Sequence, residues 1–213
     1  MTNISTLFIL TLILTALSSC GQTPKGFDNG AYVVDQNIKA KVDKKVKSFY
    51  GVTESSMDFK VFQNDRIVGN TYDRGKSIDK CMTTSSLDGD TLNITGFIGM
   101  FGGFGYQIAL FKDTCIVRHF MKSDVKIYKL KKTDSLSFGV SVPCKNYKLT
   151  LANKPTFEKG EIVEGIIELM SEEYYEVANG NERKYKMQLT GYFKTEPLTS
   201  MKDTNQELIY KIK

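Results

Sequence analysis

Cysteine and histidine are the first side chains to consider as nucleophile, base or metal ligand in this chain. The 213 residues hold four cysteines and one histidine, namely Cys20, Cys81, Cys115, Cys144 and His119. A site built from several histidines is therefore excluded, and any hydrolase needing a histidine base would have to use His119. Cys115 and His119 share one face of a regular strand, but about 13 Å of extended chain separates them. The sequence predicts no cysteine–histidine dyad, and the cysteines lack the paired close spacing of a zinc site.

Three of the cysteines could form a disulfide bond if the chain is exported. Thiols meet oxidising conditions outside the cytoplasm, where neighbouring pairs tend to join. Cys81, Cys115 and Cys144 permit three single bridges, and each leaves one thiol unpaired. Cys115 and Cys144 both lie in or beside strongly patterned strands, so a bridge between these two is our favoured hypothesis.

Carboxylates are dense over residues 158–176, where a pair could act as the acid and base of a glycosidase. On a strand, however, Glu164 and Glu168 would share a face with Ile162 and Ile166. That mixture suits neither a catalytic pair nor a solvated face, and acidic density alone does not indicate catalysis. We therefore predict no catalytic residue, no metal, no cofactor and no enzymatic activity.

The most unusual local composition is the glycine-rich stretch over residues 96–105. It lacks the Lys-Ser/Thr ending of a P-loop, and no helix is expected after it, so phosphate binding is not predicted. The favoured interpretation is a hairpin whose glycines permit tight turns and whose aromatic side chains enter the core. The alternative is an apolar binding loop formed by Phe97, Met100, Phe101 and Phe104.

Cys20 follows an uncharged apolar segment at the start of the chain. Residues 1–24 carry no charged side chain, and residues 7–17 form an 11-residue apolar core. This core is shorter than the roughly 20 residues of a spanning helix and fits a signal peptide. The sequence Leu17-Ser18-Ser19-Cys20 resembles the lipobox of bacterial lipoproteins. A conventional secretory signal and an uncleaved membrane anchor are the alternatives.

The resemblance implies that the chain is cut before Cys20 and that the cysteine receives a diacylglyceryl thioether. In many bacteria a further acyl chain, such as palmitate, is added to the new α-amine. Two or more chains give stable anchoring. The tether after the cysteine has no acidic residue before Asp28, unlike the acidic tethers of some surface lipoproteins. We expect a lipoprotein of the cell envelope, in the outer membrane and facing the periplasm, with surface exposure as the alternative.

Residues 1–19 are thus expected to be a signal peptide, residues 20–30 a flexible tether and residues 31–213 one β-rich globular domain. A hydrophobic content of 41% and a charged content of 25% are typical of a folded protein. The net charge of +5 is mild, with lysine clusters at residues 39–47 and 126–132. A translocated protein rarely meets nucleic acid, so no nucleic-acid partner is predicted.

One amphipathic helix is expected over residues 31–50. Its apolar residues recur at intervals of four, four, four and three, and lysines fill the remaining arc. They are Val34, Ile38, Val42, Val46 and Phe49. We expect this stripe to pack against a sheet, with binding at a membrane interface as the alternative.

After Gly51 the hydrophobic period changes to two, which is typical of strands with one buried face. The alternating segments are residues 92–94, 104–110, 115–121, 136–142, 147–151 and 185–193. Residues 161–177 have helical spacing, but their glycines and β-branched cluster favour a strand. The predicted fold class is mainly β, an antiparallel β-sandwich or barrel-like domain with one N-terminal amphipathic helix.

These features predict a membrane-anchored lipoprotein that presents a non-catalytic β-rich domain for protein interaction or structural support. The alternative is a barrel or sandwich that binds an apolar small ligand through residues 97–104. The predicted partners are the lipid bilayer, through acylated Cys20, and an unidentified envelope protein or apolar ligand.

Overall fold

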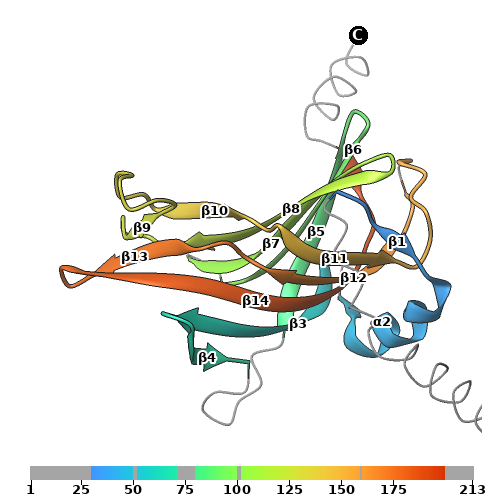
Figure 1. The fold of residues 1–213 in the computed structure, drawn as a ribbon. Coiled ribbons are helices and arrows are strands. Elements are labelled where there is room, and N and C mark those ends of the chain that lie inside the picture. The colour runs from blue at the N-terminus through green and yellow to red at the C-terminus, as the bar shows by residue number, and fades with distance from the viewer. Residues whose placement is uncertain (1–29, 50–51, 72–79, 100–101, 159, 200–213) are drawn as a thin grey trace, which may run out of the picture.

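The computed structural model describes residues 30–49, 52–71, 80–99, 102–158 and 160–199 (Figure 1). Cys20, the predicted signal peptide, Met100 and Phe101 lie outside the described residues. Within them the protein is mainly β, with fifteen strands and one short α-helix. This confirms the predicted fold class.

The described elements begin and end as follows. The helical segments are the 3-10 turn η2 (Gln36–Ile38) and the α-helix α2 (Lys39–Lys45). The strands are β1 (Val33–Val34), β2 (Lys47–Phe49), β3 (Val52–Gln63), β4 (Arg66–Asn70), β5 (Lys80–Asp88), β6 (Thr91–Ile98), β7 (Gly103–Phe111), β8 (Thr114–Lys122), β9 (Tyr128–Lys129), β10 (Gly139–Pro143), β11 (Asn146–Leu151), β12 (Val163–Met170), β13 (Tyr174–Ala178), β14 (Asn181–Thr195) and β15 (Leu198–Thr199).

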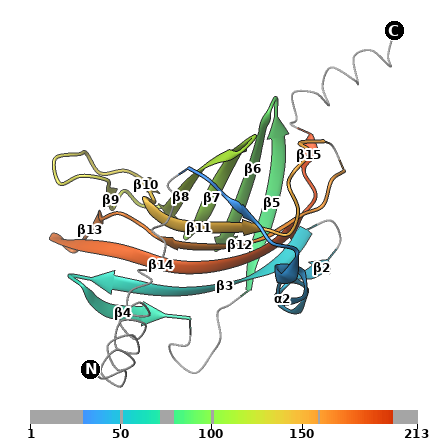
Figure 2. The same ribbon diagram turned by 45° about the vertical axis from the view of Figure 1, so that its right-hand side comes forward.

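The strands form one curved sheet (Figure 2). Its hydrogen-bonded path runs β1-β11-β12-β14-β3-β5-β6-β7-β8-β10. All pairs along this path are antiparallel except β1 with β11. The strands β5 to β8 are neighbours in the sheet in chain order, and the alternation predicted over residues 92–94, 104–110 and 115–121 lies within β6, β7 and β8.

Two short segments join the edges of the curved sheet and make the domain barrel-like. At one end of the molecule, Ala31 bridges Thr114 at the start of β8, and the next residues pair with β11. At the other end, Tyr128 of β9 bridges Ser137 just before β10, while β9 also pairs with β13. Gly30, assigned to the tether from the sequence, already belongs to this domain because its carbonyl accepts a hydrogen bond from the Cys115 amide.

Side chains from around the sheet meet in one packed interior. Its fully buried members include Met57, Leu92, Tyr106, Ile167 and Phe193. The Tyr106 ring extends from β7 towards β14, where a Cβ atom on Gly191 would lie 2.5 Å from the ring. This contact requires glycine at position 191, and it fills the centre of the barrel with protein atoms.

The N-terminal helix is shorter than the sequence predicted. The expected helix over residues 31–50 was wrong at both ends, because α2 covers only Lys39–Lys45 and residues 47–49 form β2. Upstream, the Asp35 amide donates to the Leu151 carbonyl, which holds the chain beside β11. The Asp35 carboxylate then caps η2 by accepting from the Asn37 amide at 3.0 Å. Val34 therefore lies on β1 and is exposed.

The packing predicted for this helix is confirmed. Val42 and Val46 are buried in a small cluster with Ile166 of β12 and Tyr192 of β14. This cluster lies on the outer face of the sheet, so α2 covers β12 from outside while the main core covers it from inside. Burial on both faces explains the apolar residues at consecutive positions of β12, and it confirms the strand predicted within residues 161–177.

The predicted alternation over residues 136–142 is only partly a strand. β10 begins at Gly139, and Leu136 and Phe138 are exposed in the loop before it. Val140 and Val142 are buried as expected. Together with Tyr128 and Tyr174, these two valines form a third cluster of buried side chains.

Candidate functional site

An open groove of about 880 Å³ lies where β12 ends and β13 begins. Its walls come from the loop after β9, the β10–β11 turn, the β12–β13 connection and β14. The lining residues are Leu130, Lys131, Lys132, Pro143, Lys145, Asn146, Met170, Ser171, Glu172, Glu173, Tyr175 and Lys186. We call this set of residues the charged groove.

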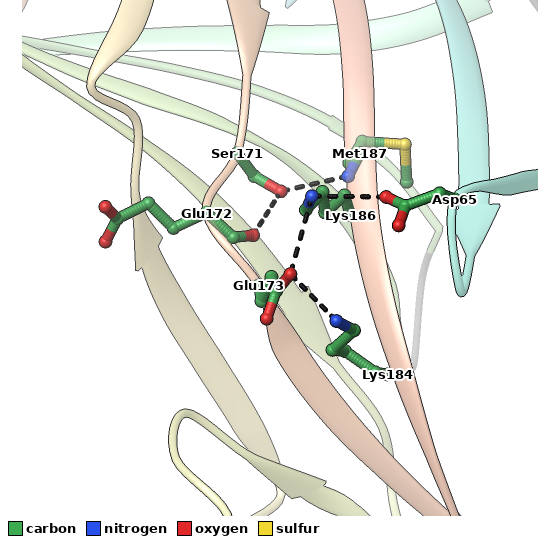
Figure 3. Close-up of polar contacts among 7 residues, drawn as sticks. All are labelled: Asp65, Ser171, Glu172, Glu173, Lys184, Lys186 and Met187. Atoms are coloured by element: carbon green, nitrogen blue, oxygen red, sulfur yellow. Dashed lines mark hydrogen bonds and ion pairs between the residues drawn. The ribbon is translucent and has the colours of Figure 1, made fainter.

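Ser171 sets the shape of the groove floor (Figure 3). Its backbone amide donates to the Met187 carbonyl, and its hydroxyl accepts from the Met187 amide at 2.9 Å. The hydroxyl also donates to the Glu172 carbonyl at 2.8 Å. The Ser171 side chain thus takes the place of a backbone acceptor where β12 ends. The chain turns after it, so that Glu172 and Glu173 pair with different lysines.

The two glutamates hold lysines from separate parts of the chain. Glu172 pairs with Lys145 at 2.6 Å. Glu173 accepts from Lys184 at 3.0 Å and pairs with Lys186 at 3.4 Å, and Lys186 also reaches Asp65 at 3.3 Å (Figure 3). The hydrogen bond from Lys184 is the main reason why the pKa of Glu173 lies below its ordinary value. These pairs are partly exposed, so they orient the side chains more than they stabilise the fold.

Positive charge remains on one wall of the groove. The lining contains four lysines against two glutamates, and both glutamates are already paired. Lys131 and Lys132 are exposed, and no described carboxylate pairs with their ammonium groups. The Asp134 carboxylate lies close by, accepting from the Lys131 backbone amide at 2.8 Å, so two exposed ammonium groups with one neighbouring carboxylate face solvent on this wall of the charged groove.

Sequence reasoning missed this site, although part of it was readable. The Asn179-Gly180 turn makes a tight hairpin of β13 and β14, so Tyr174 lies opposite Tyr185. Counting outward from that turn would have placed Glu173 opposite Lys186. Nothing local indicated the contribution of Asp65, which lies 121 residues away from Lys186 in sequence.

The predicted apolar loop is divided between the core and the surface. The glycine-rich stretch is a hairpin, as favoured, and Phe104 packs edge-on against Phe59 with ring centroids 4.8 Å apart. Phe97 and Phe104 both line a surface cleft of about 250 Å³, with Phe120 and Lys122 among its other lining residues. We call this second site the Phe97 cleft. Met100 and Phe101 lie outside the described residues.

His119 is buried inside the barrel. Its Nδ1 atom lies 2.9 Å from the Gly105 carbonyl, and its ring centroid lies 5.7 Å from that of Tyr174. The Nε2 atom is buried without a hydrogen-bond partner in the described residues. The His119 side chain does not reach solvent. This burial lowers the pKa of His119 to about 4, so the ring is neutral near pH 7.

No disulfide bond joins the described cysteines. The favoured Cys115–Cys144 bridge is therefore not formed in the structure. The Cys115 thiol lies 3.6 Å from the Tyr147 hydroxyl, which donates to the Cys115 carbonyl and accepts from the Gly30 amide. Burial raises the pKa of Cys115 and raises that of Cys144 to about 12, so both thiols are poor nucleophiles.

The carboxylates of β12 serve the fold. Glu164 is only 5% exposed and pairs with Lys194 at 2.5 Å and with Lys39 of α2 at 4.0 Å. Glu168, on the same face, is exposed. Through these pairs Glu164 links the helix to the sheet.

No family model, curated protein or solved structure matches the chain. Within the described ranges, no three His, Cys, Asp or Glu side chains are grouped to hold a metal ion. The described part of the chain also has no helix long and apolar enough to cross a membrane.

Proposed function

We propose that the chain is a lipid-anchored protein of the bacterial cell envelope, acylated on Cys20, that binds another envelope protein through the charged groove. The lipobox resemblance of Leu17-Ser18-Ser19-Cys20 supports the anchor. Two features of the domain support a binding role rather than a catalytic one: burial raises the pKa of the Cys115 and Cys144 thiols, and His119, the only histidine of the sequence, is buried.

The observation that carries the interaction role is the pair of exposed ammonium groups in the groove that form no ion pair with a described carboxylate. Lys131 and Lys132 face solvent beside Lys145, whose charge is balanced by Glu172. Such a surface favours a partner that brings its own carboxylates, and Tyr175 adds an aromatic contact of the kind enriched at protein interfaces. The interior of the barrel offers less, because Tyr106 and its neighbours fill it.

Photocrosslinking in intact cells tests this role. A photoreactive amino acid replaces Lys145 in the groove, and in a matched protein it replaces Lys148, an exposed residue of β11. We expect one discrete crosslinked species from position 145, absent from position 148 and lost after Lys131→Glu with Lys132→Glu. Equal products at both positions, or a product insensitive to the charge reversal, would contradict the proposed interface.

The Phe97 cleft supports a second candidate function, the binding of an apolar small ligand. Its volume of about 250 Å³ is below the roughly 300–1,000 Å³ of common ligand pockets, so it ranks second. Native mass spectrometry of protein purified from cells would show a retained small molecule, and Phe97→Asp would remove it. A ligand retained equally by that variant would exclude the cleft as its site.

We further propose that the protein resides in the outer membrane and faces the periplasm, because no acidic residue precedes Asp28 in the tether. Protease treatment of intact cells distinguishes the two orientations. Protection until the outer membrane is opened is the expected result, whereas digestion of intact cells would establish surface exposure.

A further inference from the structure

We infer that the outward face of α2 is a docking surface for the anionic headgroups of the membrane that carries the protein. This inference rests on the proposed lipid anchor. Contact between α2 and the headgroups would be a second attachment to the bilayer, besides the acyl chains on Cys20. It would thereby fix the orientation of the domain on the membrane. The surface consists of Lys41, Lys44 and Lys45, and we call it the α2 lysine face.

The packing of α2 determines which side chains face outward. Val42 and Val46 are buried against the sheet, whereas Lys41, Lys44 and Lys45 are exposed. Lys41 and Lys45 lie 5.6 Å and 5.7 Å from the centroid of the Tyr192 ring. These contacts hold two ammonium groups near one ring, on the flank of the helix beside β14. Lys44 is also exposed.

The nearby carboxylates do not neutralise this face. Asp43 pairs with Lys194 at 3.0 Å, and Glu164 pairs with the same lysine and with Lys39. Both acids are thus held at the base of the helix by lysines outside the α2 lysine face. No described carboxylate pairs with Lys41, Lys44 or Lys45, so the outward charge is available to an anionic surface.

The position of α2 in the fold points to a membrane as the occupant. The domain begins at Gly30, held beside Cys115, and α2 begins nine residues later at Lys39. Nine residues separate Cys20 from Gly30, a span of at most about 35 Å when extended. A tether of this length would let α2 reach the bilayer, where each lysine near an anionic surface gains roughly 1 kcal/mol.

This orientation leaves the charged groove accessible. Figures 1 and 2 both place α2 at the opposite end of the molecule from β9 and β13, which border the groove. With α2 on the headgroups, the groove would face away from the bilayer. One basic surface then serves the membrane, and the other remains free for a protein partner.

Vesicle binding of the mature chain with Cys20→Ser tests the inference without help from acyl chains. The vesicles contain phosphatidylcholine alone or a 70:30 mixture with phosphatidylglycerol, and binding is measured by co-sedimentation at low salt. The test variant is Lys41→Gln, Lys44→Gln and Lys45→Gln. The control is Lys126→Gln, Lys131→Gln and Lys132→Gln, which removes the same charge from exposed lysines at the other end. Thermal unfolding checks that both variants fold.

Binding should require phosphatidylglycerol and should be lost in 0.5 M NaCl. It should fall roughly fivefold for each lysine removed from α2, so about a hundredfold for the triple variant, and by much less for the control. Equal losses in the two variants, or salt-resistant binding to neutral vesicles, would overturn the inference. Absence of acyl labelling on the native protein would instead refute the anchor and leave this vesicle result unaffected.

Discussion

Replacing His119 with glutamine should make the stability of the domain less sensitive to acid. His119 is the only histidine, and burial lowers its pKa from 6.5 to about 4 in the folded state. Between these values the unfolded chain binds a proton that the folded chain does not. The free energy of unfolding therefore falls as the pH drops from about 6.5 to about 4. A shift of this size corresponds to about 3 kcal/mol, fully expressed below pH 4.

Urea unfolding followed by circular dichroism at pH 7.5, 6.0, 5.0 and 4.5 measures this effect. The glutamine side chain can still donate to the Gly105 carbonyl, which lies 2.9 Å from Nδ1 of the histidine. Carboxylates titrate in both proteins, so the difference between the two stability curves reports the histidine. We expect His119→Gln to gain about 2 to 3 kcal/mol relative to the native protein by pH 4.5. Parallel curves over this range would refute the burial of a neutral imidazole.

Three other perturbations follow from the packing. Gly191→Ala should lower the free energy of unfolding by about 1 to 3 kcal/mol, because its Cβ would press on the Tyr106 ring, whereas Gly180→Asn in an open turn should be nearly neutral. Chemical denaturation measures both, and an unchanged midpoint for the alanine variant would contradict the close contact. Glu164→Gln should lower the free energy of unfolding by about 1 to 3 kcal/mol, because it weakens a charged hydrogen bond of a buried carboxylate. Glu168→Gln, at an exposed position of the same strand, should change it little. Equal effects of the two substitutions would contradict the role assigned to Glu164. The three described cysteines should resist maleimide in the native state and react after unfolding, as mass spectrometry would show, and rapid native labelling would contradict their burial.

Most strands could be predicted because each has one face in the core. The alternation over residues 104–110 and 115–121 corresponds closely to β7 and β8, whose inner residues are buried. The dipeptide Asn179-Gly180 is typical of a tight hairpin turn, and both residues adopt the positive φ angles of such a turn. Local sequence determines both features, so no knowledge of distant residues was needed.

The sequence predictions were wrong where a contact with a residue distant in sequence determines the local structure. Val34 fits the helical stripe, but Asp35 bonds to Leu151 and the chain becomes a strand there. The charged groove likewise depends on Asp65 reaching Lys186 across 121 residues. Hydrophobic periodicity has no access to such long-range pairs, so neither the start of the helix nor the groove could be predicted from it.

The central proposal is that Cys20 carries the lipid that anchors the domain. Metabolic labelling with an alkyne fatty acid, followed by membrane fractionation, tests it on the native chain and on Cys20→Ala. We expect the native protein to be labelled and to stay with the membrane in high salt, while the variant accumulates as an unlabelled precursor. Label that persists in Cys20→Ala, or an unlabelled native protein, would contradict the anchor.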